Sequence, residues 1–159
     1  MSEDIRIKND KFSFHYRVAG LIEQNGKFLI QKIDGYDYYI LPGGHVKLGE
    51  SSRDAIGREI LEEVECDIKS SKLFCVHENF YMKNGVLEHF IENYFLINPD
   101  GELKNNNWSV QENDDGRIFN YNFYWFSIDE IKNIDLKPTA IKELIINNKY
   151  NDFNYLIRE

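Results

Sequence analysis

Apolar residues along the chain follow two spacings, alternation with polar residues and recurrence every three to four positions, and each spacing predicts a different element. Residues 12–22 carry strand-favouring side chains and predict a first long strand. Asn25 and Gly26 follow it, and Asn-Gly is a strong signal for a tight hairpin. Residues 27–32 then form the returning strand.

The region beyond this hairpin is divided by turn residues. We expect a short strand over residues 38–41, stopped by the Pro-Gly-Gly turn at residues 42–44. Farther along, residues 73–81 and 87–97 predict a second antiparallel pair, with a Lys-Asn-Gly turn at residues 83–85. The chain is therefore expected to build much of its fold from antiparallel strands.

The best-defined helix runs from Ser51 to Val64. Ser51 or Ser52 can cap its first turn. Ile56, Ile60 and Val64 recur every four residues and predict an apolar stripe that packs on the core.

The last third of the chain is polar before it becomes aromatic. Residues 101–122 are rich in Asn, Asp and Gly, and we expect them to form one long loop. Residues 123–127 predict a last strand. Ser127 and Glu130 have the spacing of a capping box and predict a short helix, and a final helix is expected over residues 138–147.

Composition and charge narrow the class of protein. The 159 residues are 42% hydrophobic and 14% aromatic, which suits one globular domain over residues 1–159. The net charge of −8 argues against binding to a nucleic acid polymer, which favours a basic surface. An acidic site can still bind a small polyphosphate when divalent cations lie between them.

The cysteines and the N-terminus predict the cellular compartment. Cys66 and Cys75 form neither a CxxC motif nor a zinc pattern, so we expect two reduced thiols. The first residues contain no apolar signal core, and no apolar stretch approaches the roughly 20 residues that span a bilayer. We therefore expect a cytoplasmic protein with no membrane partner.

Three glutamates share one side of the predicted helix. Glu59, Glu62 and Glu63 fall within an arc of about 100° at 3.6 residues per turn. Like charges at these spacings destabilise a helix by a few tenths of a kcal/mol per pair, and a bound Mg²⁺ would offset that repulsion. A solvated acidic surface explains the same pattern, so helical spacing alone leaves both interpretations open.

The residues around these glutamates resemble the Nudix box. That motif consists of a Gly, five residues, a Glu, seven residues and then Arg-Glu-apolar-any-Glu-Glu. The matching positions in this chain are Gly44, Glu50, Arg58, Glu59, Ile60, Leu61, Glu62 and Glu63. The order of the predicted strands and helices also resembles the Nudix hydrolase family.

The resemblance implies an α/β fold, an α/β/α sandwich with a mixed β-sheet and a loop-helix-loop catalytic motif. It also implies that Glu59, Glu62 and Glu63 are catalytic and bind Mg²⁺ or Mn²⁺. The carbonyl group of Gly43 is implied as a further metal ligand, at a turn where glycine allows a close approach.

Other positions of the motif imply structural roles. Glu50 and Arg58 match a pair that forms a salt bridge between loop and helix in the family. In place of the glycine that usually follows the helix, this chain has Glu65. Either Glu65 takes the left-handed conformation, at on the order of 1 kcal/mol, or the helix ends differently.

The family resemblance implies hydrolysis of a diphosphate linkage in a nucleoside diphosphate derivative. Glu59 is the candidate that positions or deprotonates the attacking water. A base from another loop is the alternative, and Glu112, Asp114 and Asp115 are the acids that could supply it. Glu112 is our candidate for an additional acid.

Substrate contacts are less well defined by the sequence. Lys32 is a candidate phosphate contact, Tyr39 a candidate for stacking on a base, and His45 a residue expected near the phosphates. Nucleoside triphosphates, nucleotide sugars and dinucleotides all fit, and a homodimer is an open alternative because many members of the family are dimers. Two other classes also remain, a non-catalytic Nudix-fold regulatory module and an acidic interaction domain.

Overall fold

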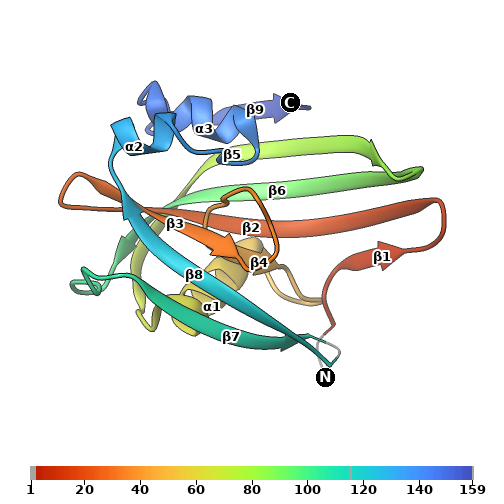
Figure 1. Cartoon of the computed structure of the whole chain (residues 1–159), viewed down its shortest axis with the longest axis horizontal. Helices are drawn as coiled ribbons and strands as arrows, with labels where there is room; N and C mark the ends of the chain where they lie inside the picture. Colours follow the sequence, from red (N-terminus) through yellow and green to blue (C-terminus); the bar gives the residue numbers. More distant parts are fainter. Residues whose placement is uncertain (1–2, 115, 159) are drawn as a thin grey trace.

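The computed structural model describes residues 3–114 and 116–158, which form nine strands and three helices (Figure 1). The elements are, in chain order, β1 (Arg6–Lys8), β2 (Phe12–Gln24), β3 (Lys27–Ile33), β4 (Gly43–His45), α1 (Ser52–Val64), β5 (Ile68–Lys83), β6 (Val86–Pro99), β7 (Trp108–Asp114), β8 (Arg117–Phe126), α2 (Ile128–Lys132), α3 (Thr139–Ile146) and β9 (Asn154–Ile157).

The strands form one mixed sheet in the order β7-β8-β3-β2-β6-β5-β9, and β1 and β4 each pair with β2. The pairs β2–β6 and β5–β9 are parallel, and the other pairs are antiparallel. This arrangement confirms the expected mixed sheet. The long β5–β6 pair confirms the second antiparallel pair, and both strands extend beyond the predicted limits.

The turn between β2 and β3 confirms the predicted hairpin. Asn25 and Gly26 have φ values of 53° and 77°, the left-handed conformation that a two-residue hairpin turn requires. Beyond this turn the two strands pair only through Glu23 with Phe28 and Gln24 with Lys27. The sheet therefore consists of two ladders, one built on β2 and one on β3, that are directly joined at one end.

The segment between β3 and α1 lies between these two ladders. Ile40 forms a bridge with Gln31 of β3, whereas Gly43 pairs with Ala19 of β2. We had expected a strand over residues 38–41, and this prediction is wrong, because that segment makes only isolated bridges. The glycine turn that was expected to end it is instead the short strand β4.

Helices cover both faces of the sheet, which gives the expected α/β/α sandwich (Figure 1). Neighbouring residues of β2 point to opposite faces, so Ile22 packs on the α1 side and Leu21 on the α2–α3 side. The core beneath α1 contains Ile56, Ile60 and Val64, as their spacing predicted. The core beneath α2 and α3 includes Ile131, Ile141, Leu144 and Ile145.

The ends of α1 follow from local chemistry. Ser51 is the N-cap, and its hydroxyl accepts a hydrogen bond of 3.1 Å from the backbone N–H of Asp54. At the other end Glu65 takes the left-handed conformation with φ of 57°, and its N–H donates to the carbonyl of Leu61 at 3.1 Å. The helix thus ends as a glycine-terminated helix does, although the residue carries a side chain.

The prediction of one long loop over residues 101–122 is wrong, because two strands run through this segment. Most of it forms the hairpin of β7 and β8, with Trp108 stacked on Phe123 at 5.0 Å between ring centroids. Trp108 and Val110 face the core beneath α1, while Ser109 between them is exposed. The outward polar residues of this edge strand hid its alternation.

The C-terminal elements agree more closely with expectation. Ser127 and Glu130 form the predicted capping box of α2, and α3 matches the predicted final helix. The aromatic strand β8 is longer than predicted and is not the last strand, because β9 pairs with β5. Across the described part of the chain, none of the helices is long and apolar enough to cross a lipid bilayer.

Candidate active site

Helix α1 buries two of its three motif glutamates. Glu59 and Glu63 are 9% and 5% exposed, whereas the side chain of Glu62 is 52% exposed. Glu59 and Glu63 lie one helical turn apart, so their side chains share one side of the helix. The structure therefore separates the three carboxylates into a buried pair and an exposed neighbour.

Arg58 ties this helix to the preceding loop. Its Nε and Nη2 atoms donate to the two oxygens of Glu50 at 2.8 and 3.0 Å, and Nη2 also donates to the carbonyl of His45 at 3.0 Å. Nη1 donates to Glu59 at 2.6 Å and lies 3.5 Å from Glu62. The guanidinium hydrogen bonds lower the pKa of Glu50. Arg58 thus holds the loop and orients Glu59.

Glu63 is buried with only half of its hydrogen-bonding capacity used. The side-chain amide of Gln31 donates to Oε1 of Glu63 at 3.2 Å, but Oε2 has no partner among the described residues. The indole N–H of Trp108 donates to the backbone carbonyl of Glu63 at 3.2 Å. Burial raises the pKa of Glu63 well above its ordinary value, and the charge of Glu59 raises it further.

Two glycines bring the backbone of β4 against its neighbours. A Cβ atom at Gly44 would meet the carboxyl group of Glu59, and a Cβ atom at Gly43 would meet the backbone carbonyl of Val18. Glycine is therefore required at both positions, at Gly44 because of the Glu59 side chain and at Gly43 because of the backbone of β2.

The pKa of Glu59 is raised by burial, and the hydrogen bond that Glu59 accepts from Arg58 opposes this shift.

The hairpin of β7 and β8 brings another acid towards the buried pair. The charge of Glu112 raises the pKa of both Glu59 and Glu63, so it lies within electrostatic range of both. Burial also raises the pKa of Tyr121 on β8, and the neighbouring Glu112 adds to this shift. Asp114 instead pairs with Arg6 at 3.4 Å. The other alternative acid, Asp115, lies outside the described residues.

Comparison with known proteins identifies the family. A profile of the NUDIX domain matches residues 13–145. The chain belongs to the Nudix family. This family of hydrolases cleaves pyrophosphate linkages, so the chain is a Nudix hydrolase.

Individual Nudix relatives are distant in sequence. The uncharacterized Nudix hydrolase YvcI of Bacillus subtilis strain 168 is 25% identical over 120 residues, which cover 74% of this chain and 69% of the relative. The MutT protein from Bacillus halodurans aligns with a TM-score of 0.67 at 16% identity, covering 91% and 89% of the two chains. A MutT Nudix hydrolase from Burkholderia pseudomallei aligns with a TM-score of 0.56 at 25% identity, covering 73% and 84%.

The donor atoms of this Nudix site suit a hard divalent cation. Glu59, Glu63 and the carbonyl of Gly43 would supply oxygen ligands, which Mg²⁺ and Mn²⁺ prefer. The unpartnered, buried Oε2 of Glu63 is the feature that fits such an ion best, because a buried carboxylate oxygen otherwise needs a hydrogen bond. Within residues 3–114 and 116–158, no three His, Cys, Asp or Glu side chains are already arranged to hold a metal ion.

Two of the predicted substrate residues, Lys32 and Tyr39, lie together. The ammonium group of Lys32 lies over the ring of Tyr39, 5.0 Å from its centroid. Successive residues of β3 alternate between faces, so Lys32 points away from the face on which Gln31 contacts Glu63. Their role in substrate binding stays a prediction.

The imidazole ring of His45 contacts other side chains of the protein. Its Nε2 atom lies 2.9 Å from Nδ1 of His15, and its Nδ1 atom lies 3.8 Å from Asp4. Burial lowers the pKa of His45 to about 3, and the charge of Arg17 contributes to this shift. His45 is therefore neutral at physiological pH and provides no charge for a phosphate.

Arg17 is a residue near the site that no sequence pattern indicated. This half-buried residue of β2 is paired in register with His45 of β4 and with Glu92 of β6. Its charge lowers the pKa of Glu63 against the effect of burial. The sequence carries no signal for it, because Arg17 lies 35 positions before Ser52, the first residue of the motif helix.

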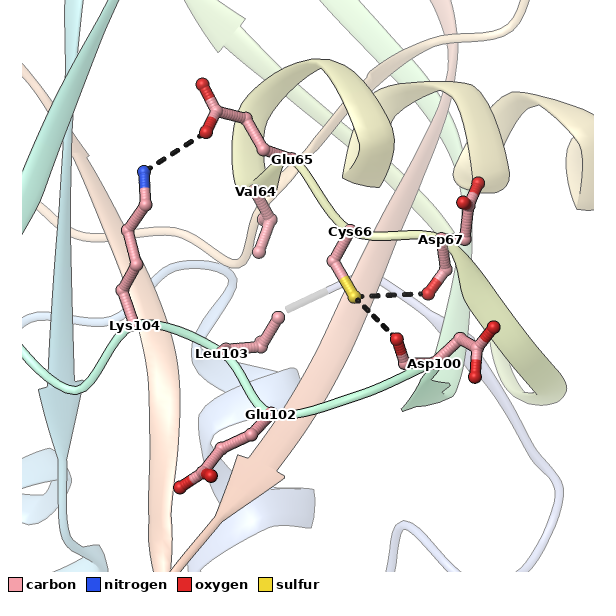
Figure 2. Close-up of a pocket in the computed structure, with 8 residues that line it drawn as sticks. All are labelled: Val64, Glu65, Cys66, Asp67, Asp100, Glu102, Leu103 and Lys104. Carbon is pink, nitrogen blue, oxygen red and sulfur yellow. Dashed lines mark hydrogen bonds and ion pairs between the residues drawn. The ribbon is translucent and has the colours of Figure 1, made fainter.

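A separate hollow lies at the C-terminal end of α1 (Figure 2). It has a volume of about 340 Å³ and is lined by Val64, Glu65, Cys66, Asp67, Asp100, Glu102, Leu103 and Lys104. Its one cationic group, Lys104, already pairs with Glu65 at 3.2 Å, and Cys66 donates to the carbonyls of Asp67 and Asp100. Because four acids, Glu65, Asp67, Asp100 and Glu102, line it, this hollow does not suit a phosphate ligand.

Proposed function

We propose that this Nudix hydrolase cleaves the diphosphate linkage of a nucleoside diphosphate derivative with the help of Mg²⁺ or Mn²⁺. One observation carries the proposal: Oε2 of Glu63 is buried and has no partner in the described structure, beside the second buried carboxylate, Glu59. Glu59 has Arg58 as a cationic partner, whereas Glu63 forms no ion pair among the described residues. A buried carboxylate without a cation is costly to ionise, and a divalent ion offsets that cost.

The metal ligands would be Glu59, Glu63 and the carbonyl of Gly43, with Glu62 as an exposed further ligand. A bound cation neutralises diphosphate charge and lowers the pKa of a coordinated water. Glu59 is held by Arg58 and serves to orient the attacking water and accept its proton. Glu112, on strand β7, is the candidate for an additional acid or base.

The substrate we propose is a small nucleotide rather than a nucleic acid polymer. The net charge of −8 disfavours a polyanionic polymer, while a small diphosphate needs only local neutralisation by the bound cations. The leaving group is open among phosphate, a sugar phosphate and a second nucleotide. A substrate panel should therefore contain nucleoside triphosphates, nucleotide sugars and dinucleotides.

The test is an assay of phosphate release, with a phosphatase added to convert other products to phosphate. The assay is run with Mg²⁺ or Mn²⁺ and, as a comparison, with EDTA. Wild-type protein should hydrolyse at least one class of substrate, and EDTA should abolish the activity. Glu59→Gln and Glu63→Gln should each lower the rate by at least roughly a hundredfold, as when a preorganised electrostatic contact is removed. Glu102→Gln, the same change at an exposed position, is the matched control. A wild-type protein inert towards the whole panel with both metals would contradict the proposal.

A further inference from the structure

Arg17 is a half-buried cation without a protein partner. Across residues 3–114 and 116–158 it donates no hydrogen bond and forms no ion pair. A guanidinium group has five N–H donors, and buried polar groups are normally hydrogen-bonded. Contacts that stabilise the fold therefore do not explain why an arginine occupies this position.

The carboxylate beside Arg17 in the sheet is already engaged elsewhere. Arg17 and Glu92 are register partners on the parallel strands β2 and β6, so their side chains leave the same face. Glu92 nevertheless accepts a hydrogen bond of 2.9 Å from the hydroxyl of Tyr94 and lies 3.4 Å from Nδ1 of His77. Among the described residues, Glu92 forms no ion pair with Arg17, although the two are register partners.

Other cations of the region are committed. Arg58 donates to Glu50, to Glu59 and to the His45 carbonyl, and Lys32 lies over the ring of Tyr39. Arg17 in contrast keeps all of its donors for water or a ligand.

The charge of Arg17 reaches both ladders of the sheet. It lowers the pKa of Glu63 on α1 and of Tyr121 on β8, and it opposes the upward shift of the pKa of Tyr38 in the segment between β3 and β4. On β2, Arg17 alternates with Val18 and is in step with Ala19 and Leu21, so its side chain leaves the face opposite α1, to which Lys32 of β3 also points. Its backbone lies beside β4, where His45 is its register partner and the neighbouring Gly44 lies against the carboxyl group of Glu59.

We propose that Arg17 binds a phosphate group of the substrate, on the side of the site opposite the metal-binding glutamates. This inference rests on the proposed function. A diphosphate bound to metal on Glu59 and Glu63 still carries negative charge that the surrounding carboxylates repel. A planar guanidinium offers two parallel N–H groups to phosphate oxygens, a geometry that an ammonium group cannot match.

Binding of methylenediphosphonate, a diphosphate analogue that is not hydrolysed, tests the inference without turnover. Calorimetric titration in the presence of Mn²⁺ would compare the wild-type protein with Arg17→Gln, Arg17→Lys and the exposed control Arg53→Gln. Arg17→Gln should weaken binding by roughly tenfold to a hundredfold, as expected for lost charge-assisted hydrogen bonds. Arg17→Lys should be intermediate and Arg53→Gln unchanged.

A titration with Mn²⁺ alone separates binding of phosphate from a structural role. Removal of a positive charge near Glu63 should leave Mn²⁺ affinity unchanged or increase it, whereas a damaged fold would weaken both ligands. The inference would be overturned if both Arg17 variants lost affinity for Mn²⁺ and for the diphosphonate equally. It would also be overturned if Arg17→Gln bound the diphosphonate with full affinity. The proposed function itself would fail if the wild-type protein neither bound Mn²⁺ nor hydrolysed a nucleotide, whatever the variants did.

Discussion

The carboxyl group of Glu59 lies directly against the Cα atom of Gly44, so that three atoms of Glu59 occupy the space a Cβ atom at position 44 would need. Glu59 comes from α1 and Gly44 from β4, which pairs with β2. The closeness of helix and strand at this point sets the position of a candidate metal ligand. Position 43 is different, because a Cβ atom there would meet the backbone of Val18.

Alanine at these two positions should therefore have different effects. Gly44→Ala displaces a side chain that can rotate, so we expect activity to fall by at least roughly tenfold with a change in Tm of a few degrees at most. Gly43→Ala collides with the backbone and should lower the free energy of unfolding by about 1–3 kcal/mol. Urea unfolding and initial rates measured on both variants check this. Full activity in Gly44→Ala would show that Glu59 does not depend on this contact.

The C-terminus of α1 offers a stabilising substitution. Glu65 adopts φ of 57°, which is strained for a residue with a side chain, and its ion pair with Lys104 is largely exposed. Glu65→Gly should stabilise the protein by about 1 kcal/mol, because an exposed ion pair contributes less than the relieved strain. Thermal unfolding should show Tm raised by roughly 2–4 °C. Glu65→Ala loses the pair and keeps the strain, so a similar rise in that control would exclude backbone strain as the cause.

The buried charge of Glu63 predicts a pH-dependent stability. Burial raises the folded-state pKa of this carboxyl well above 4.5, so its contribution to stability is complete below the unfolded pKa and is lost as pH rises through the folded pKa. In EDTA at about pH 8, Glu63→Gln should therefore have a higher Tm than the wild-type protein. The difference should shrink towards about pH 4 as Glu63 becomes protonated.

Divalent metal should reverse this order. Mg²⁺ or Mn²⁺ should raise the Tm of the wild-type protein and have a smaller effect on Glu63→Gln, because binding to the folded state stabilises it. Glu102→Gln changes an exposed carboxylate and should follow the wild-type protein under all conditions. A Tm of Glu63→Gln below wild type in EDTA at about pH 8 would contradict the assignment of a costly buried charge.

The hairpin of β7 and β8 carries two neighbouring acids with different surroundings. Glu112 interacts electrostatically with both buried glutamates, whereas Asp114 pairs with Arg6. We expect Glu112→Gln to lower kcat by roughly a hundredfold, the lower end of what a positioned acid or base contributes. Asp114→Asn should keep kcat within about twofold, since exposed ion pairs contribute little. Steady-state kinetics that showed the reverse order would move the additional acid to Asp114.

The core helix could be predicted from sequence because its information is local. Ile56, Ile60 and Val64 give the period, and Ser51 gives the start. The hairpin at Asn25 was equally local. The Nudix box then assigned Glu50 and Arg58 to each other, and the structure contains that ion pair at 2.8 Å.

Features that depend on distant partners could not be predicted in this way. Strand β7 has polar residues on its outer side, so Trp108 and Val110 were not recognised as its inner side until the partner strand was known. The burial difference between Glu59 and Glu62 depends on how α1 packs on the sheet. Arg17 has the acid Glu92 as its register partner, yet Glu92 contacts Tyr94 and His77 instead, and no local pattern encodes that choice.

The two ladders of the sheet carry different parts of the candidate site. Gly44 and Arg17 belong to the ladder of β2, whereas Glu112 and Gln31 belong to the ladder of β3. Since β2 and β3 share only two residue pairs, much of the connection between the ladders is the apolar core beneath α1. Apolar packing weakens on cooling. The position of one ladder relative to the other is therefore expected to be more sensitive to low temperature than the structure within either ladder.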